Sequence, residues 1–409
     1  MFIVKSIDET IKILEDNFKD YQLSKIVIKA EDALNYVSSK DIISLEDVPH
    51  FDRSIVDGYA VDFNSVRLAS STTPSILKLS GKVEMGKPAT INVTEETTVY
   101  VPTGGHLPKG SNSVVMIENT DQLNEEIIIN KSATIWENVL QKGTDISINS
   151  KVLSKNTVIT PLVIGALKSL GIDEIEVYKR LSVSVISTGD EIVKDKAHLE
   201  IGEIRDINSY TITNYLINKN IIISDKVIIN DDFELYKEAI LTGFKNSDIV
   251  ISSGGSSVGD KDYTYSILKE IGADLLVHGV NIKPGKPTII AKYKNKLFFG
   301  LPGQPTSAFF VLNTFIDTII NTIYHIDKVM PSPYIEAILQ LNVHSVTGRR
   351  MYQLVKVEYN DENKLIAIPL FAKSGMINAL KEASGYIIIN EFIEGKTAGE
   401  IVKVYRVGD

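Results

Sequence analysis

Three glycine-containing turns each follow an apolar stretch in the middle of the chain. They read STGDE at 187–191, SSGGSSVGDKD at 252–262 and LPGQP at 301–305. Glycine lets backbone amides approach a phosphate closely, and a helix after the turn offers its positive N-terminal end. None of the turns fits the dinucleotide pattern G-x-G-x-x-G or the P-loop pattern. We therefore expect a phosphate-bearing ligand other than NAD or a Walker-type nucleotide.

A short basic turn, KPGKP at 283–287, could supply the positive charge that such a ligand needs. The whole chain has a formal net charge of −9, so an anion must be met by a local basic cluster. Two prolines restrict the turn and lower the entropy cost of presenting Lys283 and Lys286. The alternative is an ordinary surface turn with two solvated lysines.

Carboxylates stand beside the same turns at Asp190, Glu191, Asp260 and Asp262. Mg²⁺ commonly takes one or two carboxylates together with phosphate oxygens and water. Helix capping is the alternative, and for Asp260 the two interpretations weigh equally. The six histidines form neither an H-x-x-x-H pair nor a partner for a G-x-S-x-G serine, so zinc hydrolysis and a serine triad are not expected.

The elements around these turns change in character along the chain. From 180 to 328 apolar strands alternate with helical patterns, which predicts a three-layer α/β sheet that is mostly parallel. Short apolar runs with frequent turns predict β structure over 75–160 and 334–409. Residues 1–46 are expected to be mostly helical, and 47–62 irregular.

The bulk composition sets broad limits on function. A length of 409 residues suggests two to four domains, and 44% hydrophobic residues allow sizeable cores. The absence of cysteine excludes disulfides and thiolate metal sites, and it fits a cytoplasmic protein. The acidic charge argues against nucleic acid as a partner, and no uncharged apolar run is long enough to predict a membrane span.

Seven stretches in order resemble the MoeA family of molybdopterin molybdenumtransferases, to which the C-terminal part of gephyrin is related. The match spans nearly the whole chain. The stretches are VPHFDRSIVDGYAV (48–61), PTGGHLPKGSNSVVMIEN (102–119), KGTDI (142–146), VSVISTGDEI (183–192), DIVISSGGSSVGDKDY (248–263), IKPGKP (282–287) and GLPGQPTSA (300–308).

The resemblance implies a multidomain α/β plus β fold. Its parts would be an extended helical and strand domain in two segments (1–46 and 147–179), an inserted small β domain (47–146), a central α/β molybdopterin-binding domain (180–328) and a C-terminal β-barrel (331–409). It also implies a homodimer whose site lies between the α/β domain of one copy and the inserted domain of the other.

The implied activity is molybdenum cofactor biosynthesis. The enzyme would insert molybdate or tungstate into adenylylated molybdopterin with Mg²⁺-dependent release of AMP. A molybdopterin adenylyltransferase could be a further partner. The alternatives are that the chain is itself an adenylyltransferase, or a non-enzymatic scaffold of the gephyrin kind.

The family motifs carry over to particular residues of this chain. Implied catalytic residues are Asp57, Glu191, Asp231, Asp262 and Lys283, and implied metal ligands are Glu191, Asp260 and Asp262. Substrate contacts would come from Thr103, Gly189, Asp190, Gly254, Gly255, Ser256, Lys286, Pro302, Gly303 and Pro305, with Ser374 and Asp145 weaker candidates. Taken alone, Asp57-Gly58 could be a tight turn, and Thr103 could cap one.

The sequence departs from the family pattern in three places. His278 stands where several members have lysine, Leu140 replaces a basic residue, and Gln304 replaces the usual asparagine of L-P-G-N-P. These changes bear on anion binding. Either Arg349 or Arg350 fits a family arginine near the last domain.

Overall fold

The computed structural model describes residues 4–194, 196–255, 263–326, 331–373 and 375–407. The chain forms two compact units. The larger unit comprises Met1–Ile26, Asn35–Val37 and Val177–Asp409, and the smaller unit comprises Val27–Leu34 and Ser38–Glu176. The chain therefore leaves the larger unit near its start and returns to it after residue 176.

A six-stranded sheet forms the centre of the larger unit, in the order β16-β13-β17-β21-β20-β18. The strands are β13 (Ser182–Thr188), β16 (Ile222–Ile229), β17 (Ile249–Ser253), β18 (Asp274–His278), β20 (Ile289–Tyr293) and β21 (Lys296–Leu301). The first four strands in this order pair in parallel, and β20 pairs antiparallel with both its neighbours. The prediction of a mostly parallel sheet is confirmed.

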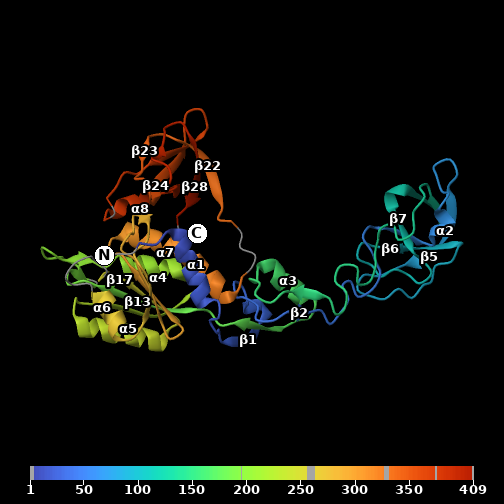
Figure 1. Ribbon diagram of the computed structural model, residues 1–409. Helices are drawn as coiled ribbons and strands as arrows, with labels where there is room; N and C mark the ends of the chain where they lie inside the picture. Colours follow the sequence, from blue (N-terminus) through green and yellow to red (C-terminus); the bar gives the residue numbers. More distant parts are fainter. Residues whose placement is uncertain (1–3, 195, 256–262, 327–330, 374, 408–409) are drawn as a thin grey trace. The chain divides into compact units, whose positions relative to one another are not determined.

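Helices cover both faces of this sheet (Figure 1). They are α1 (Ile7–Phe18), α4 (Asn208–Asn218), α5 (Phe233–Asn246), α6 (Tyr263–Glu270) and α7 (Pro305–Tyr324). Alternate strand residues face opposite ways: Ile249 and Ile251 join the core with α1, α4 and α7, whereas Val250 joins the core with α5 and α6. The domain therefore has the three layers that the sequence predicts.

Local signals fix where these helices begin. The Ser6 side chain accepts from the Glu9 amide at 3.1 Å, and the Glu9 carboxylate accepts from the Ser6 amide at 2.8 Å, which is a capping box for α1. Pro305 occupies the first turn of α7. By length and composition α7 could cross a membrane, but it packs as a core helix, with Phe310 and Phe315 fully buried.

A second sheet closes into a barrel near the C-terminus. Its strands are β22 (Tyr334–Leu339), β24 (Arg350–Tyr359), β25 (Leu365–Pro369), β26 (Gly385–Ile389) and β28 (Ile401–Arg406). The ring runs β24-β25-β22-β28-β26 and returns to β24. Its interior is filled by Leu339, Val355, Ile387 and Val404. This confirms the predicted C-terminal barrel.

A short strand ties the barrel to the α/β sheet region. β19 (Ile282–Lys283) pairs in parallel with the start of β24, so that Ile282 lies opposite Arg350 and Lys283 opposite Met351. The helix α8 (Ile377–Glu382) follows β25, and the hairpin of β23 (Val343–His344) and β27 (Gly395–Lys396) completes the domain.

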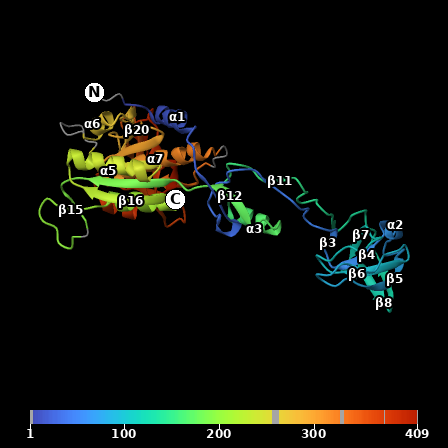
Figure 2. The same cartoon turned by 90° about the horizontal axis from the view of Figure 1, so that it is seen from below.

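The smaller unit contains a six-stranded sheet in the order β7-β4-β6-β5-β9-β8, most of whose strands are labelled in Figure 2. Its strands are β4 (Gly58–Val61), β5 (Ser75–Lys82), β6 (Thr97–Val101), β7 (Ser113–Met116), β8 (Thr120–Leu123) and β9 (Glu126–Ile129). Short pairs β2 (Ile42–Ile43) with β11 (Lys151–Leu153) and β3 (Arg53–Ser54) with β10 (Val139–Leu140) lead into it, and α2 (Phe63–Val66) and α3 (Pro161–Ser169) complete the unit.

Two expectations about the first 62 residues are wrong. Helix α1 ends at Phe18, and the stretch KIVIK forms β1 (Lys25–Lys29), because its β-branched residues alternate between exposed and half-buried positions. The segment 47–62 is not wholly irregular, since Gly58–Val61 is a buried central strand. The carboxylates on either side, Asp57 and Asp62, masked the short apolar run GYAV.

Candidate functional site

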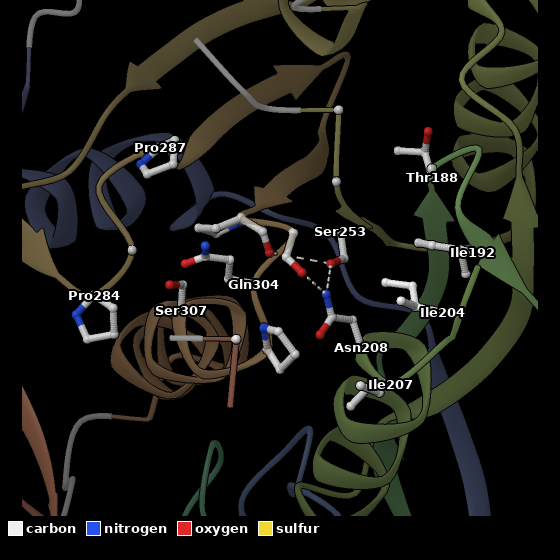
Figure 3. A pocket seen from close by; sticks show the side chains of 18 of the residues that line it. Thr188, Ile192, Ile204, Ile207, Asn208, Ser253, Pro284, Pro287, Gln304 and Ser307 are labelled. Atoms are coloured by element: carbon white, nitrogen blue, oxygen red, sulfur yellow. Dashed lines mark hydrogen bonds between the residues drawn. The ribbon is translucent and has the colours of Figure 1, made fainter. Parts of the chain in front are cut away.

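A cavity of about 1220 Å³ lies at the carboxyl ends of the parallel strands of the larger unit. Loops after β13, β16, β17 and β21 line it, together with the KPGKP turn and residues of the barrel. Ligands of open α/β sheets bind at this edge. In Figure 3, Thr188 and Ile192 lie on one side of the cavity, Pro284 and Pro287 lie on the other, and Ser253 and Gln304 lie between them.

The turn after β17 requires glycine. Gly254 has a φ of +98°, and a Cβ atom there would lie 2.4 Å from the backbone oxygen of Thr188. Only a residue without a side chain can bring the loop after β17 so close to the end of β13. Gly254 and Gly255 thereby allow the backbone after β17 to lie beside the end of β13. Both glycines line the cavity.

The loops after β13 and β16 form an acidic wall, defined here as Asp190, Glu191 and Asp231. Asp231 accepts a hydrogen bond from the Thr188 hydroxyl at 2.6 Å, and its amide donates to Asp190 at 3.0 Å. A Cβ on Gly189 would lie 2.8 Å from Glu191 Oε2, so glycine makes room for that carboxylate. Glu191 and Asp231 line the cavity. Asp190 is not part of the lining, and it contacts the wall by accepting the hydrogen bond from the Asp231 amide.

Opposite lies a basic wall, defined as Lys283, Lys286 and Arg349. All three are half-buried and line the cavity. Within the described part of the chain, none of the three makes an ion pair. Arg350, in contrast, pairs with Glu391 at 3.3 Å and with Asp8 at 3.4 Å. The structure thus directs Arg349, not Arg350, to the cavity.

Two helices begin at the cavity. Asn208 starts α4, and Gln304 and Pro305 start α7. The N-terminal end of a helix favours negative charge; at α4 the Asp206 carboxylate supplies it by accepting from the Ser209 amide, whereas α7 has no side-chain cap. Together with the basic wall, the start of α7 makes this part of the cavity suited to an anion. Pro302, Gly303 and Pro305, which were predicted from the LPGQP motif, all lie in the lining.

Two further polar residues of the site were not predicted. Asp206 is 9% exposed and accepts hydrogen bonds from the Ser209 amide at 3.1 Å and the Ser187 hydroxyl at 3.3 Å. Asn208 donates to Ser253 Oγ and to the Gly303 carbonyl, both at 2.7 Å. The stretch RDIN that contains both residues resembles the start of many helices. Their hydrogen-bond partners lie up to 95 positions away in sequence, so no local pattern identifies them as site residues.

The barrel is held to the α/β domain by an aromatic junction. Phe310 of α7 packs against Tyr352 and Tyr386 of the barrel, with ring centroids 5.1 and 5.3 Å apart. Asn313 donates to the Tyr386 hydroxyl at 3.0 Å and accepts from Tyr215 of α4 at 2.8 Å. Burial raises the pKa of Tyr386 to about 12. This junction fixes the domain that contributes Arg349 to the cavity.

Several predicted residues lie in the smaller unit. The Thr103 amide donates to Asp57 Oδ1 at 2.9 Å, so the structure brings these two exposed residues together. Gly58 belongs to strand β4, and the tight-turn alternative for Asp57-Gly58 is therefore wrong. Asp145 is an exposed residue of the same unit.

Four predicted positions lie outside the described residues: Ser256, Asp260, Asp262 and Ser374. Among the residues that are described, no group of three or more His, Cys, Asp or Glu side chains is placed to hold a metal ion. The neighbours Gly255 and Gly375 do line the cavity.

Comparison with known proteins covers the whole architecture. Residues 5–171 match the MoeA N-terminal region (domains I and II), 184–322 match a molybdopterin-binding domain, and 336–407 match the MoeA C-terminal region (domain IV). The chain is 34% identical to a molybdopterin biosynthesis protein of Methanocaldococcus jannaschii, with 96% of each chain covered. It is 29% identical to the molybdopterin molybdenumtransferase of Haemophilus influenzae, with 92% of each covered.

Solved structures agree with these matches. The molybdopterin biosynthesis MoeA protein of Pyrococcus horikoshii OT3 superposes with a TM-score of 0.83 at 27% identity, over 98% of this chain and 100% of that one. A second structure of the P. horikoshii protein gives 0.78 at 31% identity, over 99% of both. With the same domains in the same order along nearly its full length, this chain belongs to the MoeA family.

Proposed function

We propose that this enzyme of molybdenum cofactor biosynthesis inserts molybdate or tungstate into adenylylated molybdopterin and releases AMP. The observation that carries the proposal is the basic wall: three half-buried cations without ion pairs in the described chain, facing a cavity at the phosphate-binding edge of the sheet. Unpaired half-buried cations in an acidic protein are costly unless an anionic ligand completes them.

Cleavage of a bond between two phosphates depends on positioning and charge neutralisation more than on a covalent nucleophile. Lys283 and Lys286 would bind phosphate or the metal oxyanion, and Arg349 would add a third charge. Backbone amides of the loops after β13, β17 and β21 would hold the remaining phosphate oxygens. Molybdate would supply the attacking oxygen, so no Ser, Cys or His nucleophile is required.

The acidic wall fits a Mg²⁺ ion bound jointly with substrate. Such an ion needs only one or two carboxylates beside phosphate oxygens and water, and the Glu191 carboxylate lies in the space left by Gly189. Glu191 would be a ligand together with Asp260 and Asp262, and Mg²⁺ would neutralise phosphate charge. Asp231, held by Thr188, would orient substrate beside it.

We further propose a cytoplasmic homodimer in which Asp57 and Thr103 of the partner subunit complete the cavity. Subunit mixing tests this. Copies carrying Asp57→Ala and copies carrying Glu191→Ala should each be inactive, and refolding them together should restore part of the activity in mixed dimers. Inactivity of the mixture at every ratio would contradict a shared site.

The direct test is AMP release from adenylylated molybdopterin with Mg²⁺ and molybdate, tungstate or neither. We expect oxyanion-dependent release in the wild type and none in Glu191→Ala, while Glu238→Ala, an exposed change on α5, remains active. Pyrophosphate formation from ATP and molybdopterin without oxyanion-dependent AMP release would instead establish an adenylyltransferase. Inactivity in both assays would favour the scaffold alternative.

A further inference from the structure

Asn208 occupies an unusual position at the base of the cavity. It is the first residue of α4 and is 8% exposed. Its Nδ2 atom lies 2.7 Å from Ser253 Oγ, at the end of β17, and 2.7 Å from the Gly303 carbonyl, in the loop after β21. Figure 3 shows this side chain reaching both loops. One amide group therefore joins two loops that line the cavity.

The chemistry of these partners fixes the orientation of the amide. A backbone carbonyl can only accept, so the nitrogen must face Gly303, and both of its hydrogens are then used. Ser253 Oγ accepts one of them and lies 3.4 Å from the Pro302 carbonyl, to which it donates. Asn208, Ser253 and the 302–303 backbone thus form a closed set of hydrogen bonds between the two loops.

The oxygen of the same amide is turned away from solvent. Asn208 Oδ1 is inaccessible to solvent and has no hydrogen-bond partner among the described residues. An unpaired buried carbonyl is unfavourable, and it persists here because the nitrogen side is doubly bound. The adjacent Asp206 anchors the same turn through Ser187 and Ser209.

We propose that Asn208 is a positioning residue that holds the end of β17, which leads into Gly254 and Gly255, in register with the phosphate-binding loop after β21. This inference rests on the proposed function, because it assigns those loops to the substrate phosphates. Donation by the side chain, not its size, is the property required. Asn208→Asp keeps the shape but places an oxygen against the Gly303 carbonyl, so it should break the set as Asn208→Ala does.

The test compares Asn208→Asp and Asn208→Ala with Asn214→Ala, which changes an exposed asparagine on the same helix whose side chain donates to the Tyr210 carbonyl. In the AMP-release assay we expect both Asn208 variants to lose on the order of 10²-fold in kcat/KM, chiefly through KM. Asn214→Ala should match the wild type. Asn208→Ala and Ser253→Ala should be less than additive when combined, because they disrupt one set of bonds.

Amide hydrogen exchange provides a readout that needs no substrate. Peptides covering 250–255 and 300–305 should exchange faster in both Asn208 variants, whereas peptides of α5 should not change. Wild-type activity in Asn208→Asp, or unchanged exchange in both loops, would overturn the proposal. If the wild type releases no AMP, the proposed function fails, and the exchange measurement alone decides whether Asn208 holds the loops.

Discussion

The two walls of the cavity are stabilised in different ways. On the acidic wall, Asp231 is bonded to the Thr188 hydroxyl and to Asp190 through its own amide. On the basic wall, Lys283, Lys286 and Arg349 have no ion pairs within the described residues. Two of the three carboxylates of the acidic wall are hydrogen-bonded within the protein, whereas we propose that the basic wall is completed by an anion. Stability and function should therefore respond differently to changes on the two sides.

The largest effect should come from Lys283→Ala. Removing one donor aimed at developing charge typically lowers kcat by about 10²–10³-fold. The melting temperature should stay the same or rise, because an uncompensated charge is removed. AMP release and thermal unfolding would be measured together, with Lys237→Ala, whose lysine pairs with Glu270, as the control. A clear loss of stability in Lys283→Ala would show that the basic wall is self-supporting.

Gly254→Ala should break the close approach on the acidic side. Its positive φ and the 2.4 Å contact with Thr188 predict a loss of about 1–3 kcal/mol in the free energy of unfolding, with loss of activity. Gly272→Ala is the matched control, because Gly272 also has a positive φ (+73°) but nothing within 4 Å of its Cβ position. Urea unfolding of both variants separates steric contact from backbone strain, and equal losses would contradict the contact.

Alkaline pH should weaken the attachment of the barrel that contributes Arg349. Burial raises the pKa of Tyr386 to about 12, so the neutral phenol is the form that the fold favours. Its contribution is complete below pH 10 and is lost as pH rises towards 12, by roughly 2 kcal/mol. Unfolding free energies of the wild type and Tyr386→Phe between pH 8 and 12 should converge. Parallel curves would exclude Tyr386 as the titrating group.

The smallest effect is expected for Arg350→Gln. This half-buried arginine pairs with the half-buried Glu391 and the exposed Asp8, so that its loss should lower the free energy of unfolding by about 1–2 kcal/mol. Its kcat/KM should match the wild type, whereas Arg349→Gln should lose activity with little change in stability. Comparing kcat/KM of Arg349→Gln and Arg350→Gln therefore tests whether Arg349 belongs to the basic wall. Equal values for the two variants would overturn that assignment.

Much of the fold could be predicted because its signals are local and periodic. The stretches SVSVIST and DIVISS are continuous apolar runs typical of buried parallel strands, and both are strands here. The KIVIK stretch was not predicted as a strand. Its alternation of exposed and half-buried residues spans only five positions, and the helical pattern that starts at Ile7 was extended over it. Short strands like β4 depend on neighbours that lie far away in sequence.

The site residues could be predicted where they belong to a short sequence motif with a known chemical role. Glycine turns and KPGKP contain nine of the predicted site residues that line the cavity, because glycine and proline shape the turns at strand ends and lysine supplies positive charge there. Asn208 and Asp206 could not be found this way, since their roles come from Ser253, Gly303 and Ser187, which the fold brings near them. Neither could the choice between Arg349 and Arg350, which depends on the position of Glu391.

The pairing of β19 with β24 has a consequence for the order in which this protein is made. Lys283 lies opposite Met351, and the Arg350 amide donates to the Asn281 carbonyl at 3.2 Å. A ribosome must therefore add some 68 further residues after Lys283 before the strand that aligns it exists. The acidic wall belongs to the α/β domain, whose last core helix α7 ends at Tyr324, so it can form before the basic wall, and a nascent chain acquires its means of holding an anion late in translation.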